Sequence, residues 1–209
     1  MKNTEKKTKD NFKKIISEKK VQRYLKFLKK YDKETYEHSM RVSILCFYLS
    51  HKNSLPVKEI RKLCISGLFH DLGKIGIPKK VLYKAANLTK EEKEIINKHV
   101  RLGFLKLKNF DEDIKKIVIS HHEYQKHAYP RKNNERRNNK RNKKDRRESN
   151  GELQKLSKIL AVADIYDALI NKRSYKKAVP KKEVEKILKK ELTKDKYIKK
   201  IINHTKTLN

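Results

Sequence analysis

The chain has 209 residues and a formal net charge of +32, with 57 Lys and Arg against 25 Asp and Glu. This length suffices for one good hydrophobic core, and apolar residues occur throughout, so we expect one domain. No apolar run approaches the ~20 residues that span a bilayer, and the N-terminus lacks the apolar segment of a signal peptide. The two cysteines, Cys46 and Cys64, lie among apolar residues, which is typical of buried thiols in a reducing compartment. We therefore expect a cytoplasmic protein without a transmembrane segment.

Apolar residues recur at spacings of three and four, and no stretch alternates with period two, so the chain is predicted to be all helical. Residues 1–32 are expected to form one or two basic helices that pack on a domain over 33–209. The helices predicted in that domain are, in chain order, about 34–49, then Pro56 to His70 ended by Gly73, Thr89 to Leu107 opened by a capping box with Glu92, Asp111 to His122, 153–170, and a pair after Pro180.

A strongly basic segment interrupts this pattern. Residues 131–147 contain six of the eleven arginines of the chain, ten basic residues in total, and no apolar residue. Such a segment cannot contribute to a core, so we expect a mobile basic loop over 131–150. A solvated insertion is the favoured explanation, and electrostatic docking of nucleic acid, anionic lipid or an acidic partner is the alternative.

The stretch LFHDLGKIGIP, residues 68–78, places His70 and Asp71 at the end of an apolar run. A buried carboxylate is costly unless a basic side chain or a metal ion lies beside it. Lys74 follows Asp71 by three residues, on the same side if the turn continues. Asp164 has the same need within KILAVADIYDALI, where the nearest basic residue, Lys158, is six positions away.

The histidines supply a common explanation. Five of the eight lie at or near apolar helical faces, spread over four predicted helices: His38, His70, His99, His121 and His122. One such histidine is usually a hydrogen-bonded core residue, but five on separate helices beside carboxylates are better explained by a metal cluster. Glu34 precedes His38 by four residues, which puts both side chains on one helix face.

Mixed imidazole and carboxylate ligands without cysteine indicate iron, manganese or zinc. Asp71 has two oxygens and can therefore bridge two ions. Two ions ~3.5–4 Å apart share a hydroxide that attacks phosphorus, while the same ions stabilise the pentavalent charge. Lys74 would then neutralise a phosphate oxygen, so we predict catalytic roles for Asp71 and Lys74.

At this point the residues resemble a known family. The ordered motifs HSMRV, LFHDLGKIGIP, LTKEEKEIINKHV, HHE, Tyr129-Pro130 and ILAVADIYDALINKRSYKKA, over about 34–178, resemble the HD-GYP branch of the HD-domain metal-dependent phosphohydrolases. The resemblance implies an all-α HD-domain helical bundle with a metal centre in the bundle core. It also implies a phosphodiesterase that hydrolyses the bacterial second messenger cyclic di-GMP to linear pGpG or GMP with two or three divalent ions, iron or manganese.

The resemblance also assigns roles to individual residues. It implies metal ligation by His38, His70, Asp71, His99, His121, His122 and Asp164, with Glu34 serving a third ion. It implies substrate contacts from Lys74, Tyr129, Arg173 and Lys176. Asp167 is expected to support a ligand rather than to bind metal itself.

The signature loop departs from the family pattern. The family has HHExxDGxGYP, whereas this chain has HHEYQKHAYP, one residue shorter and without the glycines that permit close backbone approach to a ligand. Two alternatives therefore stay open: a phosphohydrolase acting on another nucleotide or on RNA, and a non-catalytic cyclic-dinucleotide-binding or interaction module. A variant without residues 131–147 would separate these alternatives. If it lost activity on long nucleic acid alone, the RNA alternative would be supported.

Overall fold

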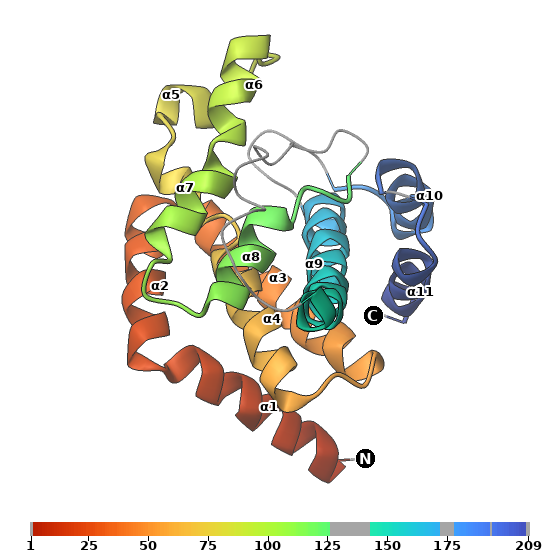
Figure 1. The fold of residues 1–209 in the computed structure, drawn as a ribbon. Coiled ribbons are helices and arrows are strands. Elements are labelled where there is room, and N and C mark those ends of the chain that lie inside the picture. The colour runs from red at the N-terminus through yellow and green to blue at the C-terminus, as the bar shows by residue number, and fades with distance from the viewer. Residues whose placement is uncertain (1, 126–142, 172–177, 193, 208–209) are drawn as a thin grey trace.

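A computed structural model describes residues 2–125, 143–171, 178–192 and 194–207, with the backbone alone at 2–9, 143–150 and 181. The predicted all-α bundle is confirmed, since the named elements of these residues are all helices (Figure 1). They are α1 Lys2–Ser17, α2 Lys19–Tyr31, α3 Lys33–Lys52, α4 Val57–Phe69, the 3-10 helix η1 Leu72–Gly76, α5 Lys79–Leu82, α6 Lys90–Asn97, α7 His99–Lys106, α8 Glu112–Ser120, α9 Lys143–Ile170, α10 Lys181–Glu191 and α11 Lys196–Thr205. None of these helices combines the length and apolar character needed to cross a membrane.

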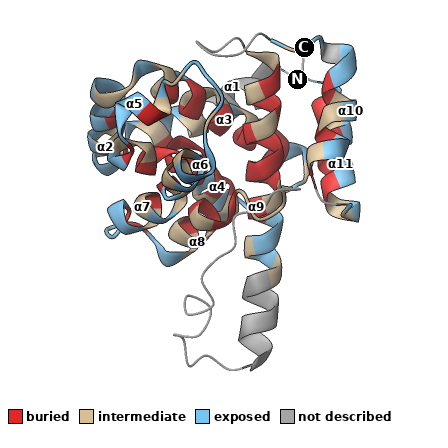
Figure 2. Cartoon of the chain, turned by 90° about the horizontal axis from the view of Figure 1, so that it is seen from above, coloured by how far each residue is buried: buried red, intermediate tan, exposed pale blue. Residues whose placement is uncertain are grey.

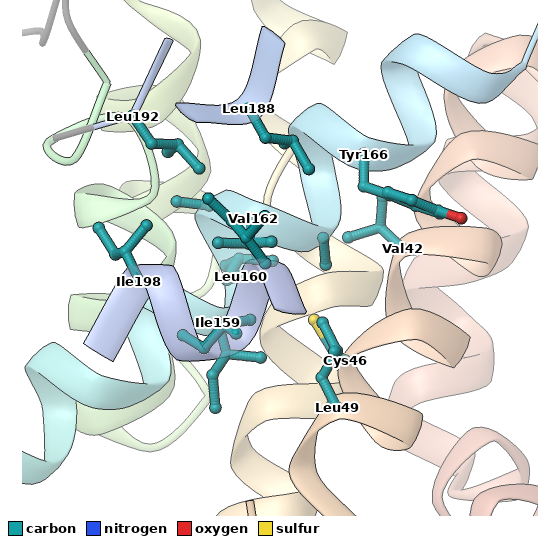
Figure 3. Close-up of a cluster of buried hydrophobic side chains, with 14 of the residues drawn as sticks. Val42, Cys46, Leu49, Ile159, Leu160, Val162, Tyr166, Leu188, Leu192 and Ile198 are labelled. Atoms are coloured by element: carbon teal, nitrogen blue, oxygen red, sulfur yellow. The ribbon is translucent and has the colours of Figure 1, made fainter. Parts of the chain in front are cut away.

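The helix α9 lies at the centre of the bundle. It packs against α3, α4 and α8 and, with its other face, against α10 and α11, and its buried residues lie between these two groups of helices (Figure 2). Figure 3 shows Val42, Cys46 and Leu49 of α3 beside side chains of α9 and of the C-terminal pair. Both cysteine thiols are buried and free, as predicted, and burial raises the pKa of each.

The N-terminal helices complete a second cluster of buried side chains. Val21 and Leu25 of α2 pack with Phe69, at the end of α4, and with Leu72 of η1. Apolar burial of this kind contributes roughly 1.5–3 kcal/mol for each fully buried large side chain. Because η1 packs between α2 and α7, both helices help to fix the segment that carries the His70-Asp71 pair.

Local sequence determines where two of the helices begin. The Asp32 carboxylate caps α3, accepting hydrogen bonds from the backbone N–H of Glu34 and Thr35 at 3.0 and 3.1 Å. Thr89 and Glu92 form the predicted capping box at the start of α6. Each cap satisfies amide donors that would otherwise lack partners, which contributes ~1 kcal/mol.

The single helix predicted over Thr89 to Leu107 is wrong, because the structure has two helices, α6 and α7, with a break at Lys98. At the break, the His99 side chain donates its Nδ1–H to the backbone carbonyl of Ile96 at 2.7 Å. A side chain that takes a backbone acceptor in this way competes with the regular helical ladder.

The predicted role of Gly73 as a helix cap is also wrong. The helix α4 ends at Phe69, and the chain then passes through His70 and Asp71 into η1. None of the described glycines has a positive φ. A Cβ atom at Gly73 would lie 1.8 Å from the carbonyl oxygen of His99. Gly73 is therefore needed because η1 approaches the backbone of α7, not because a turn requires positive φ.

The predicted mobile loop over 131–150 can be compared with the structure only over its last eight residues. Residues 131–142 lie outside the described residues, whereas 143–150 belong to α9, which begins at Lys143. The sequence places this basic stretch directly before an apolar helix, and helix, once nucleated, propagates into adjoining residues.

Candidate metal centre

Five helices bring the predicted metal ligands to one place inside the bundle. His38 comes from α3, His70 and Asp71 follow α4, His99 begins α7, His121 and His122 follow α8, and Asp164 lies in α9. Six of these seven residues are buried, and His122 is half-buried. Segments far apart in the sequence therefore meet at one cluster of imidazoles and carboxylates.

One group of ligand atoms surrounds His38. Its Nε2 lies 3.2 Å from Nε2 of His70 and 3.1 Å from Oδ1 of Asp164. Oδ2 of Asp71 lies 3.7 Å from Nε2 of His38 and 3.4 Å from Nε2 of His70. Two imidazoles and two carboxylates thus converge within a few ångströms, which matches the donor set of a divalent transition metal.

A second group consists of His99, His121 and His122, whose candidate ligand atoms all lie within 4.8 Å of one another. The other oxygen of Asp71, Oδ1, lies 3.5 Å from Nε2 of His99. Asp71 therefore presents one oxygen to each group, which is the arrangement of a carboxylate that bridges two ions.

Hydrogen bonds fix which nitrogen of each histidine faces the centre. Three of the imidazoles place Nδ1 against the backbone carbonyl three residues earlier, at 2.9, 2.7 and 2.6 Å: His70 on Gly67, His99 on Ile96 and His121 on Val118. A carbonyl only accepts, so Nδ1 carries a proton in all three, and Nε2 is the nitrogen that faces the centre and can ligate when it is not protonated. Nε2 of His121 is buried and has no hydrogen-bond partner among the described residues, so its lone pair is suited to a metal ion.

The electrostatics of the cluster favour a cation. Burial lowers the pKa of His99, His121 and His122 to about 3, so these imidazoles are neutral and able to ligate. Burial also opposes the charged form of His70, but the carboxylates of Asp71 and Asp164 outweigh it and raise its pKa to about 10. A proton on His70 therefore offsets the negative charge of the two carboxylates, which a bound metal ion would otherwise offset. The residues present fit a metal centre.

Lys74 lies directly beside this cluster. Its Nζ is 2.7 Å from Oδ2 of Asp71, on the same side as predicted. Burial would raise the pKa of the Asp71 carboxyl, but the Lys74 ammonium and the His70 imidazole hold it well below its usual range. The lysine therefore keeps Asp71 anionic and brings a positive charge to the edge of the cluster.

Glu34 lies next to the cluster and not within it. It lines a small pocket of about 30 Å³ together with His38, Lys74 and Tyr83, and a pocket of this size holds one or two water molecules. Glu34 belongs to none of the groups of converging ligand atoms found among the described residues. The remaining predicted site residues, Tyr129, Arg173 and Lys176, lie outside the described part of the chain.

A layer of hydrogen bonds behind His38 orients that ligand. Asp167 accepts the Nδ1–H of His38 at 2.7 Å, as expected for a supporting carboxylate. It also accepts from Nε and Nη2 of Arg41, at 2.8 and 3.1 Å, and from Nδ2 of Asn171 at 2.8 Å. Sequence reasoning did not identify Arg41 and Asn171; the available signal was their position one turn after His38 and Asp167, respectively.

Replacing Asp167 with asparagine is expected to weaken metal binding about 10–100-fold. The asparagine amide would direct N–H donors at groups that are themselves donors, so His38 would lose its fixed orientation. Metal titration of the purified protein measures the effect. Asn171→Ala is the matched control, because it leaves the bond between His38 and Asp167 intact. An affinity within twofold of wild type for Asp167→Asn would contradict the positioning role.

An all-helical bundle that encloses a cluster of histidines and aspartates defines this chain as a candidate binuclear metal protein. The family model for the HD domain matches residues 35–169. The chain therefore belongs to the HD-domain family, and the resemblance predicted from its motifs is confirmed.

Curated relatives share much of this chain. The cyclic di-GMP phosphodiesterase of Thermotoga maritima is 32% identical over 157 residues, which are 73% of this chain and 39% of that protein. The 3'3'-cGAMP-specific phosphodiesterase 2 of Vibrio cholerae is 31% identical over 149 residues, 69% of this chain and 26% of that protein. The chain thus spans well under half the length of these relatives.

Solved structures share the fold at lower identity. The HD domain of the L. monocytogenes phosphodiesterase PgpH, in complex with cyclic-di-AMP, superposes with a TM-score of 0.58 at 21% identity and covers 89% of this chain and 95% of its own. A HDG"Y"P protein from Bdellovibrio bacteriovorus has a TM-score of 0.61 at 20% identity and covers 96% of this chain and 61% of its own. At these identities the likeness establishes the fold alone.

Proposed function

We propose that this protein is a metal-dependent phosphodiesterase that hydrolyses cyclic di-GMP to linear pGpG or GMP. The observation that carries the proposal is Asp71, whose two oxygens face two separate groups of histidines. A bridged pair of ions is the recurrent machinery of phosphoester hydrolysis. The two curated relatives described above, a cyclic di-GMP phosphodiesterase and a 3'3'-cGAMP-specific phosphodiesterase, support a cyclic dinucleotide as the substrate.

The proposed ligands fall into two sets that share Asp71. We assign His38, His70 and Asp164 to one ion and His99, His121 and His122 to the other, with iron or manganese as the metal and Glu34 beside a third ion. When bound, such ions supply a hydroxide nucleophile at neutral pH and offset the charge that develops on phosphorus. The burial of the cluster keeps bulk water away from these charges, which strengthens every interaction among them.

The protein side chains have separate proposed tasks. The backbone carbonyls behind His70, His99 and His121 hold each imidazole with Nε2 inward. Lys74 exchanges its contact with Asp71 for a non-bridging phosphate oxygen, because both acceptors are anionic and adjacent. Tyr129, Arg173 and Lys176 are proposed as further substrate contacts, and the basic segment 131–147 as a site for an anionic partner.

The test is anaerobic incubation of protein loaded with iron or manganese with cyclic di-GMP, cyclic di-AMP or 3'3'-cGAMP, followed by chromatography of the products. Lys74→Gln is expected to lower kcat about a hundredfold with metal content unchanged, by loss of a charge that stabilises the transition state. Lys80→Gln, at a nearby exposed lysine, is the control and should retain wild-type rates. Two bound ions without turnover of any cyclic dinucleotide would overturn the proposal in favour of another phosphoester.

A further inference from the structure

A second and much larger cavity lies on the other side of η1 from the metal centre. It has a volume of about 920 Å³ and lies between α2, η1 and the end of α7, on the side of the bundle where Figure 1 shows α2 beside α7. Leu72 and Ile75 of η1 line this cavity, whereas Asp71 belongs to the metal centre. None of the proposed metal ligands lines it. A volume of this size is typical of a small-molecule site.

The cavity is strongly basic. Seven of its thirteen lining residues are Lys or Arg, and none is Asp or Glu. None of these seven cations forms an ion pair with any residue that the structure describes. Like charges gathered around one hollow repel each other, and the field of a concave surface concentrates their potential. An anionic occupant relieves that repulsion.

The floor of the cavity is aromatic and apolar. The hydroxyl groups of Tyr24 and Tyr31 donate to the backbone carbonyls of Lys106 and Ile77, at 3.0 and 2.8 Å, so both rings are held in place. Phe27, on the same helix, remains 60% exposed at the cavity. Aromatic and apolar side chains that line a hollow together with a few polar groups are the usual composition of a small-molecule site.

Together these features indicate the chemistry of the occupant. Aromatic rings provide a surface on which a nucleobase stacks, and Lys and Arg bind its phosphates. An acidic peptide would use the charge and leave the ring of Phe27 unused. A membrane surface would reach the lysines at the rim but would not fill a hollow of about 920 Å³. The nucleotide is the occupant that uses both the charge and the aromatic floor.

We propose that this cavity is a second nucleotide site, separate from the metal centre, that binds a base beside Phe27 and phosphates at Arg23, Lys30 and the neighbouring lysines. It shares two elements with the metal centre. The 3-10 helix η1 presents Leu72 to the cavity and Lys74 to the proposed ligands, and α7 carries His99 at its start and Lys106 at its end. The proposal does not depend on the phosphodiesterase activity, because binding is measured without turnover.

The test is a fluorescence-anisotropy titration of the full chain with mant-GDP, a fluorescent nucleoside diphosphate. Phe27→Ala and the double variant Arg23→Gln with Lys30→Gln are each expected to weaken binding about tenfold. Lys26→Gln removes one positive charge from an exposed position of α2 outside the cavity and should bind like wild type. Lys74→Gln, at the metal centre, should retain the binding that the cavity variants lose. The substituted cavity side chains are exposed, so all variants are expected to fold.

Three outcomes would overturn the proposal. Equal weakening by Lys26→Gln would show non-specific attraction to a basic surface. Loss of binding in Lys74→Gln with retention in the cavity variants would place the nucleotide at the metal centre. Binding of phosphatidylglycerol vesicles without binding of mant-GDP, again sensitive to Phe27→Ala, would assign the surface to lipid instead.

Discussion

Replacing Asp71 with asparagine is expected to remove bound metal and turnover together. The carboxylate faces both groups of histidines, with one oxygen 3.4 Å from Nε2 of His70 and the other 3.5 Å from Nε2 of His99. Asparagine keeps the volume but removes the charge and turns an N–H donor toward one of these lone pairs. The ions are assigned several kcal/mol of transition-state stabilisation, so we expect kcat to fall at least about a thousandfold.

The measurement is the number of ions per chain, by elemental analysis, beside the rate of cyclic di-GMP hydrolysis. Asp113→Asn is the matched control, since this carboxylate pairs with Lys62 and with none of the proposed ligands. An Asp71→Asn protein that retains two ions per chain would contradict the bridging role, whatever its activity. A protein that loses metal but keeps turnover would contradict the metal-dependent mechanism itself.

The parts of this architecture that were predictable from sequence are those that one helix specifies by itself. The spacing of apolar residues depends only on which face of a helix is buried, so the order of the major helical segments follows from it. A histidine or carboxylate on a buried face needs a partner, and that need alone indicated that His38, His70 and Asp164 meet. The capping box at Thr89 is equally local and was correctly predicted.

The parts that were not predictable depend on contacts between helices. The break at Lys98 arises where a buried imidazole takes a backbone acceptor, and periodicity carries no information about that bond. Arg41 looks like an ordinary helical residue until the fold brings α3 beside Asp167 of α9. The basic cavity has the same origin, because lysines on α2 are unremarkable in sequence until η1 and α7 close the hollow beside them.

Gly73 shows how strongly such a contact determines the site. Its position beside His70 and Asp71 suggested a helix cap, but its actual role is to let η1 lie against α7. A Cβ atom there would stand 1.8 Å from the carbonyl oxygen of His99 and 2.5 Å from the backbone nitrogen of Gly103. Both are backbone atoms, so neither can rotate away. The same approach sets the distance between Asp71 and His99, which links the packing of η1 to the geometry of the metal centre.

Gly73→Ala is therefore expected to push η1 away from α7 and to damage activity more than stability. Overpacking against backbone destabilises by ~3 kcal/mol, which lowers Tm by about 6–12 °C for a chain of this size. A displacement of about 1 Å between Asp71 and His99 would lower kcat about a hundredfold. Thermal unfolding and steady-state kinetics on the same preparation separate the two effects.

Two other glycines serve as comparison positions for this variant. A Cβ at Gly76 would meet the side chain of Leu102, with Cδ1 nearest at 2.8 Å, and this side chain can rotate, so Gly76→Ala should have a small effect. A Cβ at Gly151, within α9, meets nothing within 4 Å, and Gly151→Ala should stabilise the helix by ~0.5–1 kcal/mol. The expected order of damage is Gly73, then Gly76, then Gly151. If Gly73→Ala unfolded at the wild-type temperature with wild-type kcat, the close approach of η1 to α7 would have no part in holding Asp71 beside His99.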